Sequence, residues 1–277
     1  MTSRYYKLYK TISFWYAVVF FYKLIHQYFV FLPVVNSVRK TDLCNEIYFS
    51  NEMGGYVWPP TNSSTPMYEK TLFYLNNLSG NCSTRFGLIH RLQREFPSYT
   101  IVQLDYPGFG LSYRLDLNVK EIIYRTHETV QIILKTNKVE EFGFWTEDLG
   151  IYILAKILYN DQTLKPSFLI CHNITNTFWQ YYRNEYSFLC LPFLGSCLTY
   201  PSVSFLLSHT KIHENIKIVL FYNEKKKQDM ISSEQWYALT NISFSTKFLV
   251  ALKGSGISSF FLPENESKIT SYVQKLL

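Results

Sequence analysis

The sequence lacks several features that mark common classes of protein. Its 5 cysteines are an odd number, and none lies in a Cys-x-x-Cys pair, which argues against a zinc site or a dense disulfide framework. Cys190 and Cys197 are near enough to pair, but buried free thiols are equally compatible with the pattern. No repeat and no low-complexity segment is present. We expect no metal and no cofactor.

Basic residues are not concentrated anywhere. The formal net charge is +6, yet the only run of three basic residues is 225–227, and such a run is usually a solvated loop. No basic stripe with interleaved aromatic residues is found, so the sequence gives no support for nucleic-acid binding.

Apolar and aromatic residues are abundant. Hydrophobic residues make up 47% and aromatic residues 18% of the 277 residues, mostly Tyr and Phe, which is ample for a large core. The length fits one α/β domain with a short appendage. The many Asn, Lys and Ile residues indicate an AT-rich coding sequence, such as that of some large DNA viruses or protists.

Residues 1–36 form a candidate membrane anchor. The apolar segment 11–35 is long enough for a spanning helix, which needs ~20 residues, but Lys23, His26 and Gln27 interrupt it. A lysine at the bilayer centre costs ~3 kcal/mol on insertion scales. A single-pass anchor is favoured, and an interfacial helix and a signal peptide stay open. No small-x-small cleavage site follows the apolar run.

The flanking charges give a weak orientation. Arg4, Lys7 and Lys10 precede the segment, whereas Arg39 and Lys40 follow it, which slightly favours a cytoplasmic N-terminus and a globular part on the far, lumenal side. The chain would then be a single-pass membrane protein and a glycoprotein. Six N-x-S/T sequons give mild support: Asn62, Asn77, Asn81, Asn173, Asn241 and Asn265.

Strands and helices alternate along residues 43–277. A hairpin pattern over 43–60 is followed by strand patterns at 71–75, 99–104, 139–145, 167–171, 216–222 and 248–252. Helical spacing is found at 84–96, 119–136, 151–160, 232–239 and 266–276. The alternation predicts an α/β domain with a mostly parallel central sheet and helices on both faces. The irregular, aromatic residues 173–214 fall where a lid could be inserted.

The most informative stretch is 139–160, which predicts a buried strand, a tight turn at 146–150 and a helix. A strand, turn and helix of this kind carry the nucleophile of α/β-hydrolases within G-x-S-x-G. Here Asp148 stands at the serine position and Thr146 at the first glycine position.

Two further motifs complete a resemblance. IVQLDYPGFGLS (101–112) matches a strand followed by D-Y-x-G-x-G-x-S, and YLNNLSGNCSTR (74–85) matches an oxyanion loop followed by a helix. With the turn at Asp148, the chain resembles the α/β-hydrolase superfamily, in particular serine hydrolases with an N-terminal membrane anchor. The resemblance covers roughly residues 43–277 and implies the α/β-hydrolase fold.

The resemblance also implies a catalytic triad, which the sequence does not match. Asp148 occupies the nucleophile position; an aspartate can attack carbon, but it can equally cap the following helix. Gly256 occupies the position of the histidine, and no histidine lies beyond His213. His172, at the end of a strand, is the one candidate for a relocated base, although a core histidine is the simpler interpretation.

The remaining parts of the site also depart from the pattern. The acid position aligns with Gln228, and Asp229 lies one residue away. In the oxyanion loop, Asn76 and Asn77 replace His-Gly. The backbone N–H of Leu149, after the nucleophile position, would be the second oxyanion donor.

These departures lead to three hypotheses. The first is a catalytically inactive, membrane-anchored α/β-hydrolase-like protein that acts as a binding or scaffold module with an unknown protein partner. The alternative is a hydrolase of acyl esters, thioesters or related substrates with Asp148 as nucleophile. The third is a pocket for a lipid or acyl ligand, lined by the aromatic residues of 173–214.

Overall fold

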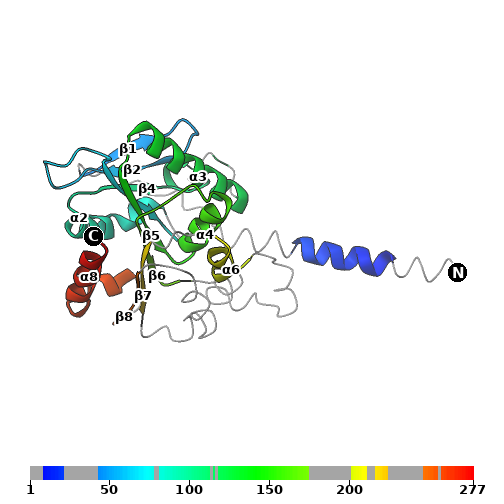
Figure 1. The fold of residues 1–277 in the computed structure, drawn as a ribbon. Coiled ribbons are helices and arrows are strands. Elements are labelled where there is room, and N and C mark those ends of the chain that lie inside the picture. The colour runs from blue at the N-terminus through cyan, green and yellow to red at the C-terminus, as the bar shows by residue number, and fades with distance from the viewer. Residues whose placement is uncertain are drawn as a thin grey trace.

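The computed structural model of the protein describes residues 9–21, 43–77, 81–112, 115, 118–174, 201–210, 216–223, 246–254 and 257–277. Figure 1 shows a central sheet with helices packed on both sides. Several sequence-based candidates lie outside these ranges: Gln228, Asp229, Gly256, Asn241, Cys190, Cys197 and the predicted helix 232–239.

The sheet has eight strands in the order β1-β2-β4-β3-β5-β6-β7-β8. β1 pairs antiparallel with β2 and β2 with β4, and every other pairing is parallel. The mostly parallel sheet predicted from the sequence is therefore confirmed. The bounds are β1 Asn45–Tyr48, β2 Gly54–Trp58, β3 Lys70–Leu75, β4 Thr100–Leu104, β5 Glu141–Glu147, β6 Phe168–His172, β7 Lys217–Asn223 and β8 Thr246–Leu252.

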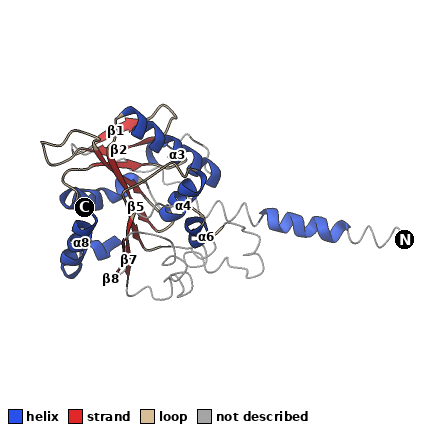
Figure 2. Ribbon diagram, viewed as in Figure 1, coloured by secondary structure: helices blue, strands red, loops and turns tan. Residues whose placement is uncertain are grey.

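Helices cover both faces of the sheet (Figure 2). One hydrophobic cluster joins one face of the sheet to α3, α4 and α6, and a second joins the other face to α2 and α8. The bounds are α2 Phe86–Glu95, α3 Val119–Thr136, α4 Gly150–Asn160, α6 Val203–Ser208 and α8 Pro263–Leu276, with short 3₁₀ helices η1 Cys82–Arg85, η2 Gly110–Ser112 and η6 Ile257–Phe261.

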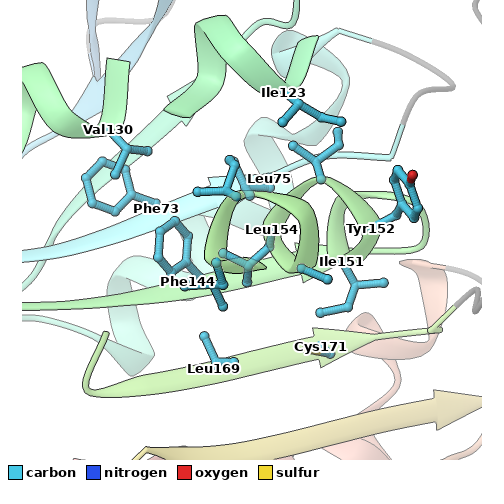
Figure 3. Close-up of a cluster of buried hydrophobic side chains, with 14 of the residues drawn as sticks. Phe73, Leu75, Ile123, Val130, Phe144, Ile151, Tyr152, Leu154, Leu169 and Cys171 are labelled. Atoms are coloured by element: carbon cyan, nitrogen blue, oxygen red, sulfur yellow. The ribbon is translucent and has the colours of Figure 1, made fainter. Parts of the chain in front are cut away.

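The central strands are apolar on both faces because helices cover each side. In Figure 3, Phe73, Phe144 and Leu169 of β3, β5 and β6 face Val130 of α3 and Leu154 of α4. The alternate residues of the same strands, Tyr74, Trp145 and Ile170, belong to the cluster on the opposite face. This double burial explains why these strands read as continuous apolar runs.

Two elements are longer than the sequence predicted. β5 extends to Glu147 rather than ending at position 145, because Thr146 and Glu147 pair with Cys171 and His172 of β6. The turn therefore begins at Asp148. α8 begins at Pro263, three residues before the predicted start, since proline suits the first helical turn and Glu264 and Glu266 favour its positive end.

The described part of the N-terminal segment is a helix over residues 9–21, blue in Figure 1, whose Val19 is partly buried against the core cluster. Among the described residues, no helix is long and apolar enough to span a membrane. Within the predicted lid-like insertion, residues 201–210 contain α6, whose Val203, Leu206 and Leu207 are buried in the core cluster with α4. The division into anchor, domain and lid stays a prediction.

Candidate functional site

The turn between β5 and α4 places Asp148 at the carboxyl end of the sheet. Its φ is 46°, and its backbone N–H donates to the His172 carbonyl at 3.0 Å, which continues the β5–β6 ladder by one bond. Non-glycine residues seldom adopt such a φ, and aspartate is among those that tolerate it. Leu149 is the N-cap residue of α4, fully buried, and its side chain makes no capping bond.

Two residues of the motif show which parts of the turn need a glycine. A Cβ at Gly150 would lie 2.4 Å from the Leu75 carbonyl oxygen, so α4 can approach β3 only because this position has no side chain. Thr146, at the first glycine position, is fully buried and donates its Oγ1 hydroxyl to the Ile170 carbonyl at 3.4 Å. The first glycine is therefore dispensable here and the second is not.

The loop after β3 contacts the turn through Asn77. The Asn77 Nδ2 donates to Asp148 Oδ2 at 3.4 Å. Asn76 points elsewhere: its Nδ2 lies 3.4 Å from Cys82 Sγ, and its carbonyl accepts the Tyr106 hydroxyl at 2.9 Å. The structure thus places Asn77 in contact with the Asp148 side chain, whereas the Asn76 side chain turns towards Cys82. Leu149 follows Asp148 at the start of α4.

A buried ion pair lies beside Asp148. The Glu147 side chain is 2% exposed and pairs with Arg85 Nε at 2.9 Å. The Tyr74 hydroxyl donates to the same carboxylate at 2.8 Å, and a second Arg85 nitrogen donates to Asn77 Oδ1 at 3.1 Å. These contacts form a continuous chain from Glu147 through Arg85 and Asn77 to Asp148.

The charges in this chain support one another. Burial alone lowers the pKa of the Arg85 guanidinium, but the charge of Glu147 and its hydrogen bonds outweigh that effect, and the pKa of Arg85 is raised. Burial, reinforced by Glu147, also raises the pKa of the Tyr74 hydroxyl well above its usual value. Arg85 is therefore a permanent cation and Tyr74 a neutral donor around Glu147.

The Asp105 loop holds the Asn76–Asn77 loop in place. The Asp105 carboxylate accepts the N–H of Cys82 at 2.7 Å and that of Leu111 at 3.0 Å, so it joins η1 to its own turn. Burial raises the pKa of Asp105, and these two N–H donors oppose the shift. Gly110 has φ 40°, and a Cβ there would lie 2.2 Å from the Asp105 carboxylate. The motif at 105–112 is therefore structural.

His172, the candidate for a relocated base, lies at the end of β6. Its register partner is Glu147, so the two side chains lie on the same face of the sheet. The imidazole is 1% exposed and packs edge-on against Phe260, with ring centroids 4.3 Å apart. The backbone of His172 adjoins Asp148, while its ring lies in the core between the sheet and η6.

The acid and histidine positions, Asp229 and Gly256, lie outside the described residues. Within the described ranges, no group of three or more metal-binding side chains comes together. Sequence reasoning missed Arg85 and Tyr74. The available signal was Glu147 itself, because a carboxylate at the end of a buried strand needs a cation or hydrogen-bond donors nearby.

Comparisons with known proteins support the fold. No protein-family model matches the chain, and no curated protein matches it. An esterase of Pyrococcus furiosus has 14% identity over 88% of this chain and 96% of its own, with a TM-score of 0.60. An α/β hydrolase superfamily protein of Enterococcus faecalis has 16% identity over 85% of this chain and 100% of its own, with a TM-score of 0.58.

A carboxyl esterase of the fungus Tuber melanosporum is similar as well, with 12% identity over 88% of this chain, 90% of its own and a TM-score of 0.58. Sequence identities this low support a shared fold but not a shared activity. The strand order, the turn at Asp148 and these similar structures agree: the chain has the α/β-hydrolase fold.

Proposed function

We propose that this protein is a membrane-attached binding module on the α/β-hydrolase fold and does not hydrolyse esters by the serine mechanism. The observation that supports this proposal best is the chain of contacts that ends on Asp148. Where a serine hydrolase has its nucleophile, this protein has a carboxylate that accepts the Asn77 amide, next to a buried Glu147–Arg85 ion pair.

Gly256 stands at the position of the histidine that moves the proton in the family, so the sequence offers no general base at that position. A positioned general base is worth ~10²–10⁴-fold in rate. The sequence has no histidine beyond His213, and the imidazole of His172 packs against Phe260. The Asp148 carboxylate further disfavours an acyl oxyanion at this place, whereas the charge of Glu147 is compensated by Arg85. These observations support ligand binding without turnover.

The test is a screen of the full chain against short acyl esters and thioesters, with a fluorophosphonate probe for an active serine. We expect no turnover beyond that of the Asp148→Ala variant and no labelling. Turnover that disappears in Asp148→Ala would contradict the proposal. Native mass spectrometry of the purified protein would identify a co-purified lipid or acyl ligand, the ligand class that we propose.

A second candidate is a hydrolase with Asp148 as nucleophile, and the similar structures favour it because they are esterases and a superfamily hydrolase. The carboxylate would attack an electrophilic carbon. An alkyl halide gives an alkyl ester with loss of halide, an epoxide gives a hydroxyalkyl ester by ring opening, and an acyl ester gives an anhydride with loss of the alkoxide. Hydrolysis of that covalent intermediate then requires an activated water. Mass spectrometry after incubation with alkyl halides, epoxides and esters would detect an adduct on Asp148, with Asp148→Asn as control.

We also propose that residues 11–35 attach the protein to a membrane, with the domain on the lumenal side. In support, most large apolar side chains of the described helix are exposed: Tyr9, Ile12, Phe14, Trp15, Tyr16, Phe20 and Phe21. Alkaline carbonate extraction of cell membranes tests the attachment. We expect the chain to stay in the membrane pellet, and complete release into the supernatant would argue against an anchor.

A further inference from the structure

The loop between β2 and β3 presents one asparagine to solvent in a fixed setting. Asn62 is exposed, while its backbone N–H donates to the Pro97 carbonyl at 2.9 Å. The Thr61 hydroxyl lies 3.4 Å from the same carbonyl. The backbone of the loop is thus tied to the turn before β4, and the Asn62 side chain is free to carry a substituent outside the fold.

The other described sequon asparagines are less exposed than Asn62. Asn173 is intermediate, and Asn77, Asn81 and Asn265 are 7%, 1% and 0% exposed. The Asn265 Nδ2 donates to the carbonyls of Lys253 and Ser259 at 2.9 and 2.8 Å, so a glycan there would break at least one of these bonds in the core. Asn77 lies in the candidate site itself. Of the five described sequon asparagines, Asn62 alone is exposed.

The sequon at Asn62 also has the local geometry of an acceptor. The Ser64 hydroxyl donates to Asn62 Oδ1 at 2.8 Å, and the Ser64 backbone N–H donates to it at 3.2 Å. Such a turn spans three residues, so it forms without the rest of the fold. Ser83 donates to Asn81 Oδ1 in the same manner, at 2.8 Å. The turn therefore does not distinguish the Asn62 sequon from the Asn81 sequon. The two differ in burial, because Asn62 is exposed and Asn81 is buried.

We propose that Asn62 carries an N-linked glycan. The inference rests on the lumenal placement of the domain proposed above. The Asn62 amide nitrogen would attack the anomeric carbon of a lipid-linked glycosyl pyrophosphate; the C–N bond forms, the C–O bond to pyrophosphate breaks, and Nδ2 loses one proton. Sequons of this type are glycosylated on surface loops of secreted domains.

The position of Asn62 leaves the candidate site uncovered. The β2–β3 loop ends where β3 begins, at Lys70, whereas Asp148 follows the last residue of β5. Because β3 and β5 are parallel, the two positions lie at opposite ends of the sheet. A glycan at Asn62 therefore shields the end of the domain remote from Asp148, and ligand access to the site is unchanged.

The experiment expresses the full chain with a C-terminal tag in a eukaryotic cell line. Glycosidase treatment in H₂¹⁸O, followed by peptide mass spectrometry, reads occupancy asparagine by asparagine. Ser64→Ala removes the Asn62 sequon, and Ser267→Ala is the matched control because Ser267 is exposed and belongs to the buried Asn265 sequon. We expect label at Asn62 in the wild type and in Ser267→Ala, and none there in Ser64→Ala.

Protease protection of the tag in intact microsomes tests the lumenal placement separately from the glycan at Asn62. A protected tag with an unmodified Asn62 overturns the assignment of this site and leaves the lumenal placement intact. An accessible tag overturns the lumenal placement and therefore also the glycan at Asn62, which requires that placement. Occupancy of Asn265 in the folded protein would refute the argument from burial.

Discussion

Removing Arg85 while keeping Glu147 probes the network beside the turn at Asp148. Arg85→Met retains most of the apolar stem but leaves a carboxylate that is 2% exposed without its cation. Breaking a buried ion pair in this way typically costs ~3–5 kcal/mol, because an uncompensated charge stays buried. Since Glu147 keeps the Tyr74 hydroxyl, at 2.8 Å, we expect the lower end, about 3 kcal/mol.

A second substitution separates the charge from the packing. In the double variant Arg85→Met with Glu147→Gln, no net charge stays buried, and the glutamine oxygen still accepts the Tyr74 hydroxyl. We expect the double variant to recover at least half of the loss, about 1.5 kcal/mol, as a coupling energy between the two positions. The two substitutions would therefore be clearly non-additive.

The assay is thermal unfolding of the detergent-solubilised full chain, followed by circular dichroism. In a domain of this size 1 kcal/mol shifts Tm by ~2–4 °C, so Arg85→Met should lower Tm by about 6–12 °C. Lys70→Met is the control, because its pair with Glu141 is 40% and 31% exposed and exposed pairs contribute ~0–1 kcal/mol. Equal losses in both variants, or strict additivity in the double variant, would refute the reasoning.

Three further predictions concern other positions of the domain. Gly150→Ala places a Cβ 2.4 Å from a carbonyl oxygen of β3 and should cost about 1–3 kcal/mol in chemical unfolding, whereas Gly87→Ala, exposed in α2, should be neutral or gain up to about 1 kcal/mol. Although burial raises it, hydrogen bonds from Thr163 and a histidine of α3 lower the pKa of Asp161 to about 2. Its stabilisation is thus present above pH ~4 and is lost as the pH falls towards 2, so Asp161→Asn should flatten the acid limb of a pH–stability curve. Asp148→Ser should stay inactive towards esters, and esterase activity in that variant would reveal a base elsewhere in the chain.

Much of the fold could be predicted from the sequence because the core is built from local patterns. α3 begins and ends where its helical spacing predicts. The structure adds that the side chain of Asn118, the residue before it, accepts the Glu121 N–H at 2.8 Å. The strand boundaries were less accurate. β5 runs on to Glu147 because β6 offers partners there, which is a property of the sheet and not of the segment.

In the candidate site, too, some features could be read from the sequence and others only from the structure. The sequence alone places Asp148 at the serine position of the motif that it resembles, places Asn76 and Asn77 at the His-Gly position, and has no histidine beyond His213, because residue types are read directly. Only the tertiary structure decided what surrounds Asp148. Arg85 lies 62 residues from Glu147 in the chain, and the two meet at 2.9 Å because β3 and β5 are neighbours in the sheet. Contacts of that kind depend on strand order, which no local pattern contains.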